Sequence, residues 1–101
     1  MVFIEDASFA KGREALLSDD EFATLQHWLL LHPESGTVIQ GSGGCRKLRW
    51  AAKGRGKRGG ARVIYFFRIS AQEILLLEIY AKNAKENLSA ADLKKLKRKI
   101  T

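Results

Sequence analysis

The chain has 101 residues, the size of a single domain. Hydrophobic residues make up 46% of it and charged residues 29%, which argues against a disordered or low-complexity protein. No apolar run approaches the roughly 20 residues of a membrane span. The first ten residues carry acids where a secretion signal carries basic residues, so we expect a cytoplasmic protein. The single cysteine, Cys45, excludes an internal disulfide framework and a zinc site of paired-cysteine type.

The net charge of +7 is divided unevenly along the chain. Residues 1–45 carry two basic and seven acidic side chains, whereas residues 46–101 carry sixteen basic and four acidic ones. A basic half of this kind predicts a polyanionic partner, because each phosphate that Lys or Arg neutralises releases condensed counterions. The alternative is a solubilising surface, but solubility does not require the two signs to be segregated.

The first half of the chain is predicted to be mainly helical. Residues 2–4 are typical of a short strand, and residues 9–17 have the apolar spacing of a helix. Ser18 stands three residues before Glu21, a capping box that opens a second helix over residues 19–32. Pro33 ends that helix, and the glycine- and serine-rich residues 34–44 predict a loop.

The second half predicts a meander of strands. Residues 46–52 alternate apolar and cationic side chains, residues 53–60 are typical of a hairpin loop, and residues 61–69 and 73–81 are typical of strands. Ser89 and Asp92 form a second capping box, which opens a basic helix that reaches about residue 100. We therefore expect an α+β fold in one domain over residues 1–101. It consists of a mainly antiparallel twisted sheet with helices packed on one face, the two N-terminal ones among them, and a basic C-terminal helix.

Basic residues are concentrated in residues 46–62, where eight cations occur together with four glycines. Alternation places Lys47, Arg49 and Lys53 on one face of their strand, and Arg62 and Arg68 on one face of the next. If the two strands pair, these cations converge on the sheet surface. Arginine offers forked donors to phosphate, and lysine offers a point charge whose pKa falls when other cations crowd it.

Other kinds of site find less support in the sequence. The glycine-rich loop around Lys57 is not a Walker loop, because it joins two strands and lacks the following Ser or Thr. His27 and His32 lie on the acidic helix and suggest no metal site. The aromatic rings of Trp50, Tyr65 and Tyr80 suit base stacking, although core packing is the simpler interpretation for Trp50.

Several motifs, in order, resemble the RelE/HigB family of bacterial toxins. They are VIQGSGG at 38–44, RKLR at 46–49, KGRGKRGG at 53–60, RVIYF at 62–66 and IYAKN at 79–83. The long basic loop and the IYAKN strand end resemble the HigB branch most closely. The resemblance implies a RelE-like fold and a toxin of a type II toxin–antitoxin system that cleaves mRNA in the ribosomal A site without a cofactor. It also implies a cognate antitoxin as partner, contact with operator DNA only through the antitoxin complex, and no membrane association.

RNA cleavage without metal uses the ribose 2′-OH as nucleophile and requires a base, an acid and charge stabilisation. Arginine stays protonated and cannot be the base, whereas a lysine crowded by cations can. The candidates for base are Lys53 and Lys57, with Lys82 next. Arg62 matches the strand arginine of the family and is assigned to the scissile phosphate, while Tyr80 orients the 2′-OH or stacks on a base. The expected RNA-binding residues are Arg46, Lys47, Arg49, Arg55, Arg58, Tyr65 and Arg68.

One departure from the family pattern concerns the end of the last strand, where RelE has a catalytic arginine. This chain has Lys82 there instead, which we expect to take the acid or phosphate role. The same fold also carries ParE-type relatives, which poison gyrase and cleave no RNA, and a non-catalytic RNA-binding module is a third alternative. The lysine-rich loop and Arg62 favour RNA cleavage.

Overall fold

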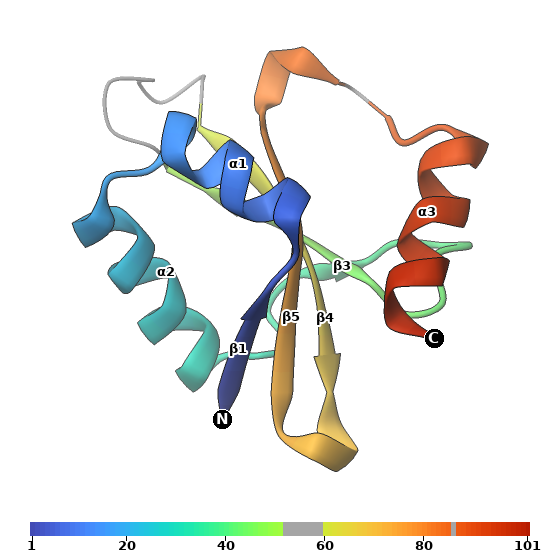
Figure 1. The fold of residues 1–101 in the computed structure, drawn as a ribbon, viewed down its shortest axis with the longest axis horizontal. Coiled ribbons are helices and arrows are strands. Elements are labelled where there is room, and N and C mark those ends of the chain that lie inside the picture. Colours follow the sequence, from blue (N-terminus) through green and yellow to red (C-terminus); the bar gives the residue numbers. More distant parts are fainter. Residues whose placement is uncertain (52–59, 86) are drawn as a thin grey trace.

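In the computed structural model, which describes residues 1–51, 60–85 and 87–101, a five-stranded sheet carries helices on both faces (Figure 1). The strands are β1 (Val2–Glu5), β2 (Thr37–Val38), β3 (Arg46–Trp50), β4 (Ala61–Arg68) and β5 (Glu73–Ala81). The helices are α1 (Ala7–Leu16), α2 (Asp19–Leu31) and α3 (Ala90–Ile100), with short 3₁₀ turns η1 (Ile69–Ala71) and η2 (Lys82–Ala84). The sheet order is β1-β5-β4-β3-β2. β1 runs parallel to β5, and the other three pairs are antiparallel, which confirms the expected α+β fold.

A β-bulge in the β4–β5 pair decides which side chains of β5 lie on each face. Ile64 pairs with Glu78, but the next residue, Tyr65, pairs with Leu76, so Leu77 is the extra residue. In a regular strand, side chains three residues apart point to opposite faces, so Leu77 and Tyr80 would lie on different faces of the sheet. The bulge instead places Tyr80 in the same core cluster as Leu77 and Ile64. The bulge therefore aims one end of β5 toward the face that carries α3.

The two faces of the sheet have separate apolar cores. Helices α1 and α2 cover one face, where Phe9, Leu25 and Leu29 are fully buried. At Gly12 a Cβ atom would lie 2.7 Å from the carbonyl oxygen of Ile79, so a glycine allows α1 to pack directly on β5. α3 covers the opposite face through Leu96. The expectation that helices share one face therefore holds for α1 and α2 but is wrong for α3.

Both predicted capping boxes are present, at Ser18 with Glu21 and at Ser89 with Asp92. The sequence did not predict β2, which has only two residues and lies within the glycine- and serine-rich stretch. The predicted strand over 46–52 ends at Trp50. The predicted hairpin loop at 53–60 lies outside the described residues except for Gly60.

Tyr65 is a structural residue of the core and not an RNA-stacking one. Its ring is fully buried on the α1/α2 face. Its hydroxyl donates to the carbonyl of Pro33 at 2.9 Å and accepts from the amide of Gly36 at 2.9 Å. A Cβ on Gly36 would lie 2.9 Å from this hydroxyl, so the turn after α2 is built around it. The prediction that Tyr65 contacts RNA is wrong, because a β-strand of alternating faces aims this side chain inward.

We expect Tyr65→Phe to lower the free energy of unfolding by about 1–3 kcal/mol, because it leaves a buried amide and a carbonyl without their partner. Urea titration measures the change. Ser35→Ala is the matched control, since it removes an exposed hydrogen bond to Trp28 Nε1, and we expect a change within about 0.5 kcal/mol. Equal effects of the two substitutions would contradict this role of Tyr65.

α3 is held to the start of α1 by an ion pair. Lys99 Nζ lies 2.9 Å from Asp6 Oδ2, and the same carboxylate accepts a hydrogen bond from the Ser8 amide at the N-cap of α1. Burial raises the pKa of Asp6, but the hydrogen bonds from Lys99 and Ser8 outweigh it, so this pKa lies below its ordinary value. The charged carboxylate thus stabilises the fold above the ordinary pKa of aspartate, and this contribution is lost as the pH falls through the lowered value.

We expect Asp6→Asn to lower the free energy of unfolding by about 0.5–1 kcal/mol at neutral pH. The difference from the unaltered protein should begin to shrink as the pH falls below about 4, where the aspartate of the unfolded chain starts to take up a proton. Urea titrations at pH 7 and pH 3 measure this. Asp19→Asn serves as control. Asp19 also forms an ion pair, with Arg13, but its own side chain is exposed to solvent, which screens the pair. A deficit that persists unchanged at pH 3 would refute the charge-based account.

Candidate nucleic-acid interface

Three neighbouring strands bring basic residues of β3 and β4 together with a tyrosine of β5 on the α3 face of the sheet. Arg49 of β3 pairs with Arg62 of β4, and Arg62 pairs with Tyr80 of β5. Lys47 pairs with Ile64, whose side chain belongs to the core under α3. Paired residues in an antiparallel ladder project to the same face. The register thus confirms that Lys47, Arg49 and Arg62 converge on one face of the sheet, while Lys53 lies outside the described residues.

A small pocket of about 140 Å³ opens at this place. It is lined by Lys47, Arg62, Tyr80, Lys82 and Lys85. Four cations around one phenol form a site with a strong preference for an anion, and the forked guanidinium of Arg62 suits a phosphate. Lys82 is exposed at the start of η2, where its amide hydrogen-bonds to the carbonyl of Gly60 at 3.3 Å. This bond fixes the end of β5 against the start of β4.

Tyr80 forms the apolar wall of the pocket and is only 8% exposed. Burial raises the pKa of its hydroxyl, Glu78 raises it further, and the cations Lys85 and Arg62 partly oppose this increase. The phenol is therefore neutral at physiological pH. In that form it donates one hydrogen bond and does not act as an anionic base.

Lys85 is held by two carboxylates beside the ring of Tyr80. Its Nζ lies 3.3 Å from Glu78 Oε1, 3.8 Å from Asp92 Oδ2 and 5.4 Å from the centroid of the Tyr80 ring. Burial by itself lowers the pKa of Lys85, but attraction and hydrogen bonding to Glu78 outweigh it, and the pKa is raised. Lys85 is therefore a fixed cation. The sequence patterns did not point to Glu78 or Lys85 as site residues and marked Asp92 only as part of a capping box; the one available signal was an acidic residue inside the apolar strand 73–81.

Arg46 does not reach this pocket. It pairs with Tyr65 on the other face of the sheet. Its guanidinium donates to the carbonyls of Glu34 and Gly36 at 3.1 and 2.8 Å and lies 3.5 Å from the Glu34 carboxylate. Arg46 therefore closes the loop after α2, and the structure does not place it with the other predicted RNA-binding residues of β3 and β4.

Arg68 shares the face of Arg62, as expected, but lies at the opposite end of β4. Its guanidinium lies over the ring of Phe66, donates to the carbonyl of Ile100 at 3.2 Å and pairs with Glu73 at 3.7 Å. The structure thus places it against the end of α3, away from the pocket. The predicted site residues Lys53, Arg55, Lys57 and Arg58 lie outside the described residues.

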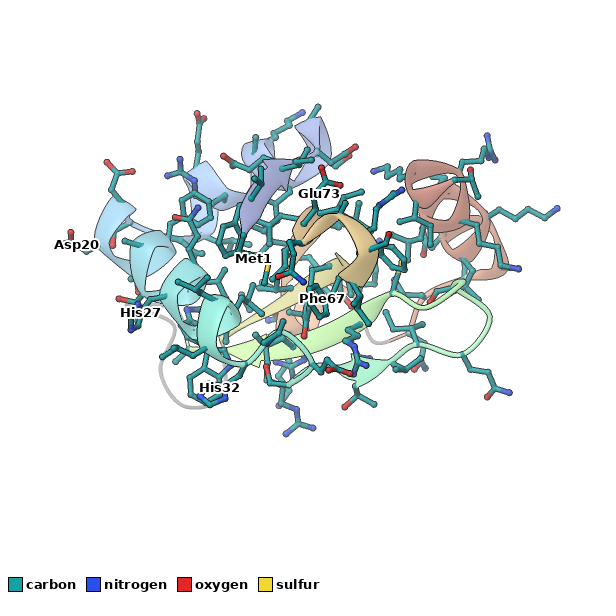
Figure 2. All side chains as sticks on the ribbon, turned by 90° about the horizontal axis from the view of Figure 1, so that it is seen from below. Met1, Asp20, His27, His32, Phe67 and Glu73 are labelled. Carbon is teal, nitrogen blue, oxygen red and sulfur yellow. The ribbon has the colours of Figure 1, made fainter. Side chains whose placement is uncertain are left out.

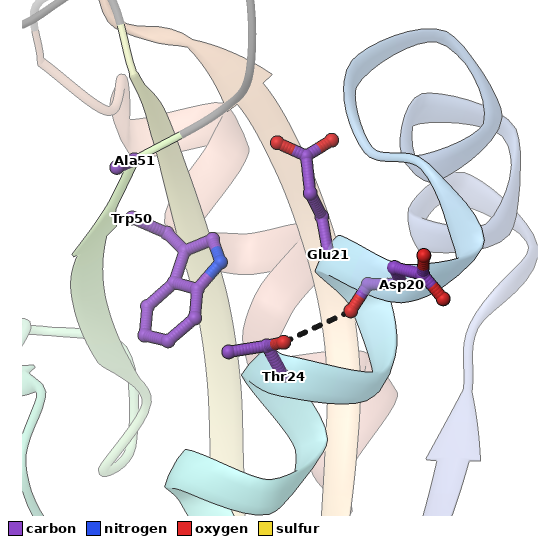
Figure 3. Close-up of a pocket in the computed structure, with 5 residues that line it drawn as sticks. All are labelled: Asp20, Glu21, Thr24, Trp50 and Ala51. Carbon is purple, nitrogen blue, oxygen red and sulfur yellow. Dashed lines mark hydrogen bonds between the residues drawn. The ribbon is translucent and has the colours of Figure 1, made fainter.

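A larger pocket of about 350 Å³ lies on the other side of the molecule, between α2 and the end of β3 (Figure 3). It is lined by Asp20, Glu21, Thr24, Trp50 and Ala51. Its two carboxylates repel phosphate, so a polyanion does not bind there. Asp20, His27 and His32 lie along α2, on the side of the molecule away from α3 (Figure 2).

Metal and membrane sites find no support in the part of the chain that the structure describes. Within residues 1–51, 60–85 and 87–101, no three His, Cys, Asp or Glu side chains are placed to hold a metal ion. No helix among these residues has the length and apolarity needed to cross a membrane. Cys45 is fully buried in the core under α3, and burial raises the pKa of its thiol, so it is not a reactive nucleophile.

Two solved structures from Escherichia coli resemble this fold. One is the crystal structure of the intact RelBE toxin–antitoxin complex, matched with a TM-score of 0.59 and 16% identity over 77% of this chain and 92% of that chain. The other is a double mutant of the toxin RelE in the free state, matched with a TM-score of 0.61 and 15% identity over 98% of this chain and 95% of that chain. At this level of identity the likeness supports the fold.

The sequence of the chain also matches the family described as the RelE toxin of the RelE/RelB toxin–antitoxin system. The match spans residues 34–100, which contain strands β2 to β5, helix α3 and every residue that lines the cationic pocket. Membership of the narrower HigB branch stays a prediction. The chain belongs to the RelE toxin family.

Proposed function

We propose that this RelE-family protein is an endoribonuclease that cleaves mRNA in the ribosomal A site and thereby stops translation. The observation that supports the proposal is the pocket in which Lys47, Arg62, Lys82 and Lys85 surround the hydroxyl-bearing ring of Tyr80. A phosphodiester and its adjacent ribose have the charge and polarity that such a pocket binds.

The proposed reaction needs no metal ion, because the 2′-oxygen of the ribose attacks the adjacent phosphorus and side-chain cations balance the charge. The bond from phosphorus to the 5′-oxygen of the next nucleotide breaks. The products are a 2′,3′-cyclic phosphate and a 5′-hydroxyl end. A base takes the proton of the 2′-hydroxyl, and an acid gives a proton to the leaving 5′-oxygen.

Side chains that the structure describes suit the roles in this reaction other than that of the base. Arg62 binds the scissile phosphate and balances the charge that develops on it. Tyr80, a neutral donor, orients the 2′-hydroxyl, and Lys82, exposed beside it, protonates the leaving oxygen or binds the phosphate. Lys47 and Arg49 hold the RNA backbone on the same face of the sheet. The raised pKa of Lys85 makes it a poor base, and our candidates for that role are Lys53 and Lys57, with Lys82 next.

We also propose that a cognate antitoxin neutralises the protein by covering the cationic face with acidic residues. The solved E. coli RelBE toxin–antitoxin complex supports an antitoxin as partner. Contact with operator DNA would then belong to the toxin–antitoxin complex and not to the toxin alone. The cytoplasm, where ribosomes translate, is the compartment in which this function operates.

We expect Arg62→Ala to reduce mRNA cleavage by about 100- to 1,000-fold, the usual effect of removing one donor to a developing oxyanion. A translation reaction programmed with one defined mRNA, followed by primer extension, reports new ends within codons. Arg98→Ala is the matched control, since it removes an exposed arginine of α3 that does not line the pocket. Unfolding in urea verifies that both variants are folded.

Cleavage by Arg62→Ala at the rate of the unaltered protein would refute the role of Arg62. If the unaltered protein leaves the mRNA intact and translation continues, the ribonuclease proposal fails, and a gyrase supercoiling assay tests the ParE-like alternative. RNA binding with a steep salt dependence and no cleaved products would indicate a non-catalytic binding module.

A further inference from the structure

We propose that Lys85 is a positioning residue of the cationic pocket, which holds Tyr80 in place and links the docking of α3 to the geometry of the site. This inference rests on the proposed cleavage of RNA at that pocket. It is carried by three contacts of the Lys85 ammonium group, two with residues of β5 and one with a residue of α3.

The first contact is with β5. Glu78 projects to the α3 face, since it pairs with Ile64, and its carboxylate lies 3.3 Å from Lys85 Nζ. The side chains of Lys85 and Glu78 are 28% and 27% exposed, so water screens this pair only in part. The ammonium group is thereby held over the Tyr80 ring at 5.4 Å from its centroid, within the range of a cation–π contact.

The second contact is with α3. Asp92 lies 3.8 Å from Lys85 Nζ, and its carboxylate also accepts the amide hydrogen of Ser89 in the capping box of this helix. The same side chain thus begins α3 and binds Lys85. Leu96, one turn further along, packs in the core cluster that contains Tyr80. A shift of α3 would therefore remove both the charge partner of Lys85 and part of the apolar support of the tyrosine ring.

The charges explain why a cation is required at this position. Without Lys85, the carboxylates of Glu78 and Asp92 would stand uncompensated beside a pocket that binds phosphate, and each would repel the substrate. Lys85 neutralises them and keeps the net charge of the pocket positive. Because the pKa of Lys85 is raised, it serves in this way at any pH near neutrality without exchanging a proton.

The experiment compares Lys85→Met with the conservative variant Lys85→Arg in single-turnover cleavage of ribosome-bound mRNA. We expect Lys85→Met to lower the maximal rate by about 10- to 100-fold, because a small displacement of reacting groups is costly, with a smaller effect on the half-saturating concentration. Lys85→Arg should restore most of the rate. Lys94→Met, which removes an exposed cation of α3, is the control for net charge.

A second readout does not depend on cleavage. The chain has two tyrosines, so ¹³C-labelled tyrosine gives two ring signals by NMR, which Tyr80→Phe assigns. Loss of the neighbouring cation in Lys85→Met should raise the pKa of Tyr80, and loss of the neighbouring anion in Glu78→Gln should lower it. Arg62 and Asp92, the other charges that act on this hydroxyl, stay in place in both variants.

The outcomes separate this inference from the proposed function. If Lys85→Met cleaves mRNA at the normal rate while Arg62→Ala does not, the positioning role is refuted and the ribonuclease function stands. A second outcome is that neither the unaltered protein nor any variant cleaves mRNA, while the pKa of Tyr80 rises in Lys85→Met and falls in Glu78→Gln. The ribonuclease proposal then fails, and the arrangement around Lys85 is supported. If the pKa of Tyr80 is unchanged in both variants, the proposed arrangement of Lys85 and Glu78 around Tyr80 is refuted.

Discussion

The register of β4 between β3 and β5 is the constraint on which the cationic pocket depends. It sets Arg49, Arg62 and Tyr80 in one row across three strands. Backbone hydrogen bonds and the apolar cores maintain this row, so the arginines stay close together although their charges repel. If β4 slipped by one residue, Arg62 would point into the core between the sheet and the N-terminal helices. The buried side chains Val63 and Tyr65 prevent such a slip, because they would then face α3.

Charge compensation complements this register on the side of β5. Glu78 and Asp92 reduce the repulsion among the cations, yet each forms its ion pair with Lys85 and not with Lys47, Arg62 or Lys82. Arg62 has no carboxylate partner among the described residues, and its one side-chain hydrogen bond there is a long one of 3.4 Å to the carbonyl of Ala61. The acids therefore stabilise the frame of the pocket, and the arginine remains available for a phosphate.

Alternation of residue types along the chain was enough to predict the main features of this site. Lys47 and Arg49 fall on one face of a short strand, and Arg62 on one face of the next, so their convergence followed once the strands paired. The bulge at Leu77 could not be predicted, since nothing in an almost continuous apolar run marks which residue is extra. For the same reason the sequence did not place Glu78 on the charged face.

Long-range contacts account for the remaining errors. Arg46 and Tyr65 both belong to the face of α1 and α2, where they close the turn after α2 through contacts that span 10 to 32 residues of sequence. A basic or aromatic residue type suggests RNA binding, but only the fold shows that these two are already engaged. Lys85 is the opposite example, a site residue that the sequence did not predict. It lies in a polar connection before α3, and nothing in that stretch indicates the two carboxylates that bind it.

Among the described residues, the acids at the start of α2 lie on the side of the molecule away from α3, whereas the cations of the pocket lie on the α3 face. The acids Asp19, Asp20 and Glu21 stabilise the first turn of α2, where they suit the positive end of the helix dipole. They thus serve helix formation and at the same time place negative charge on the side away from α3. A molecule charged in this way turns its basic side toward a polyanion as it approaches. If the protein binds RNA as proposed, we expect these acids to help orient it, although none of them lines the cationic pocket.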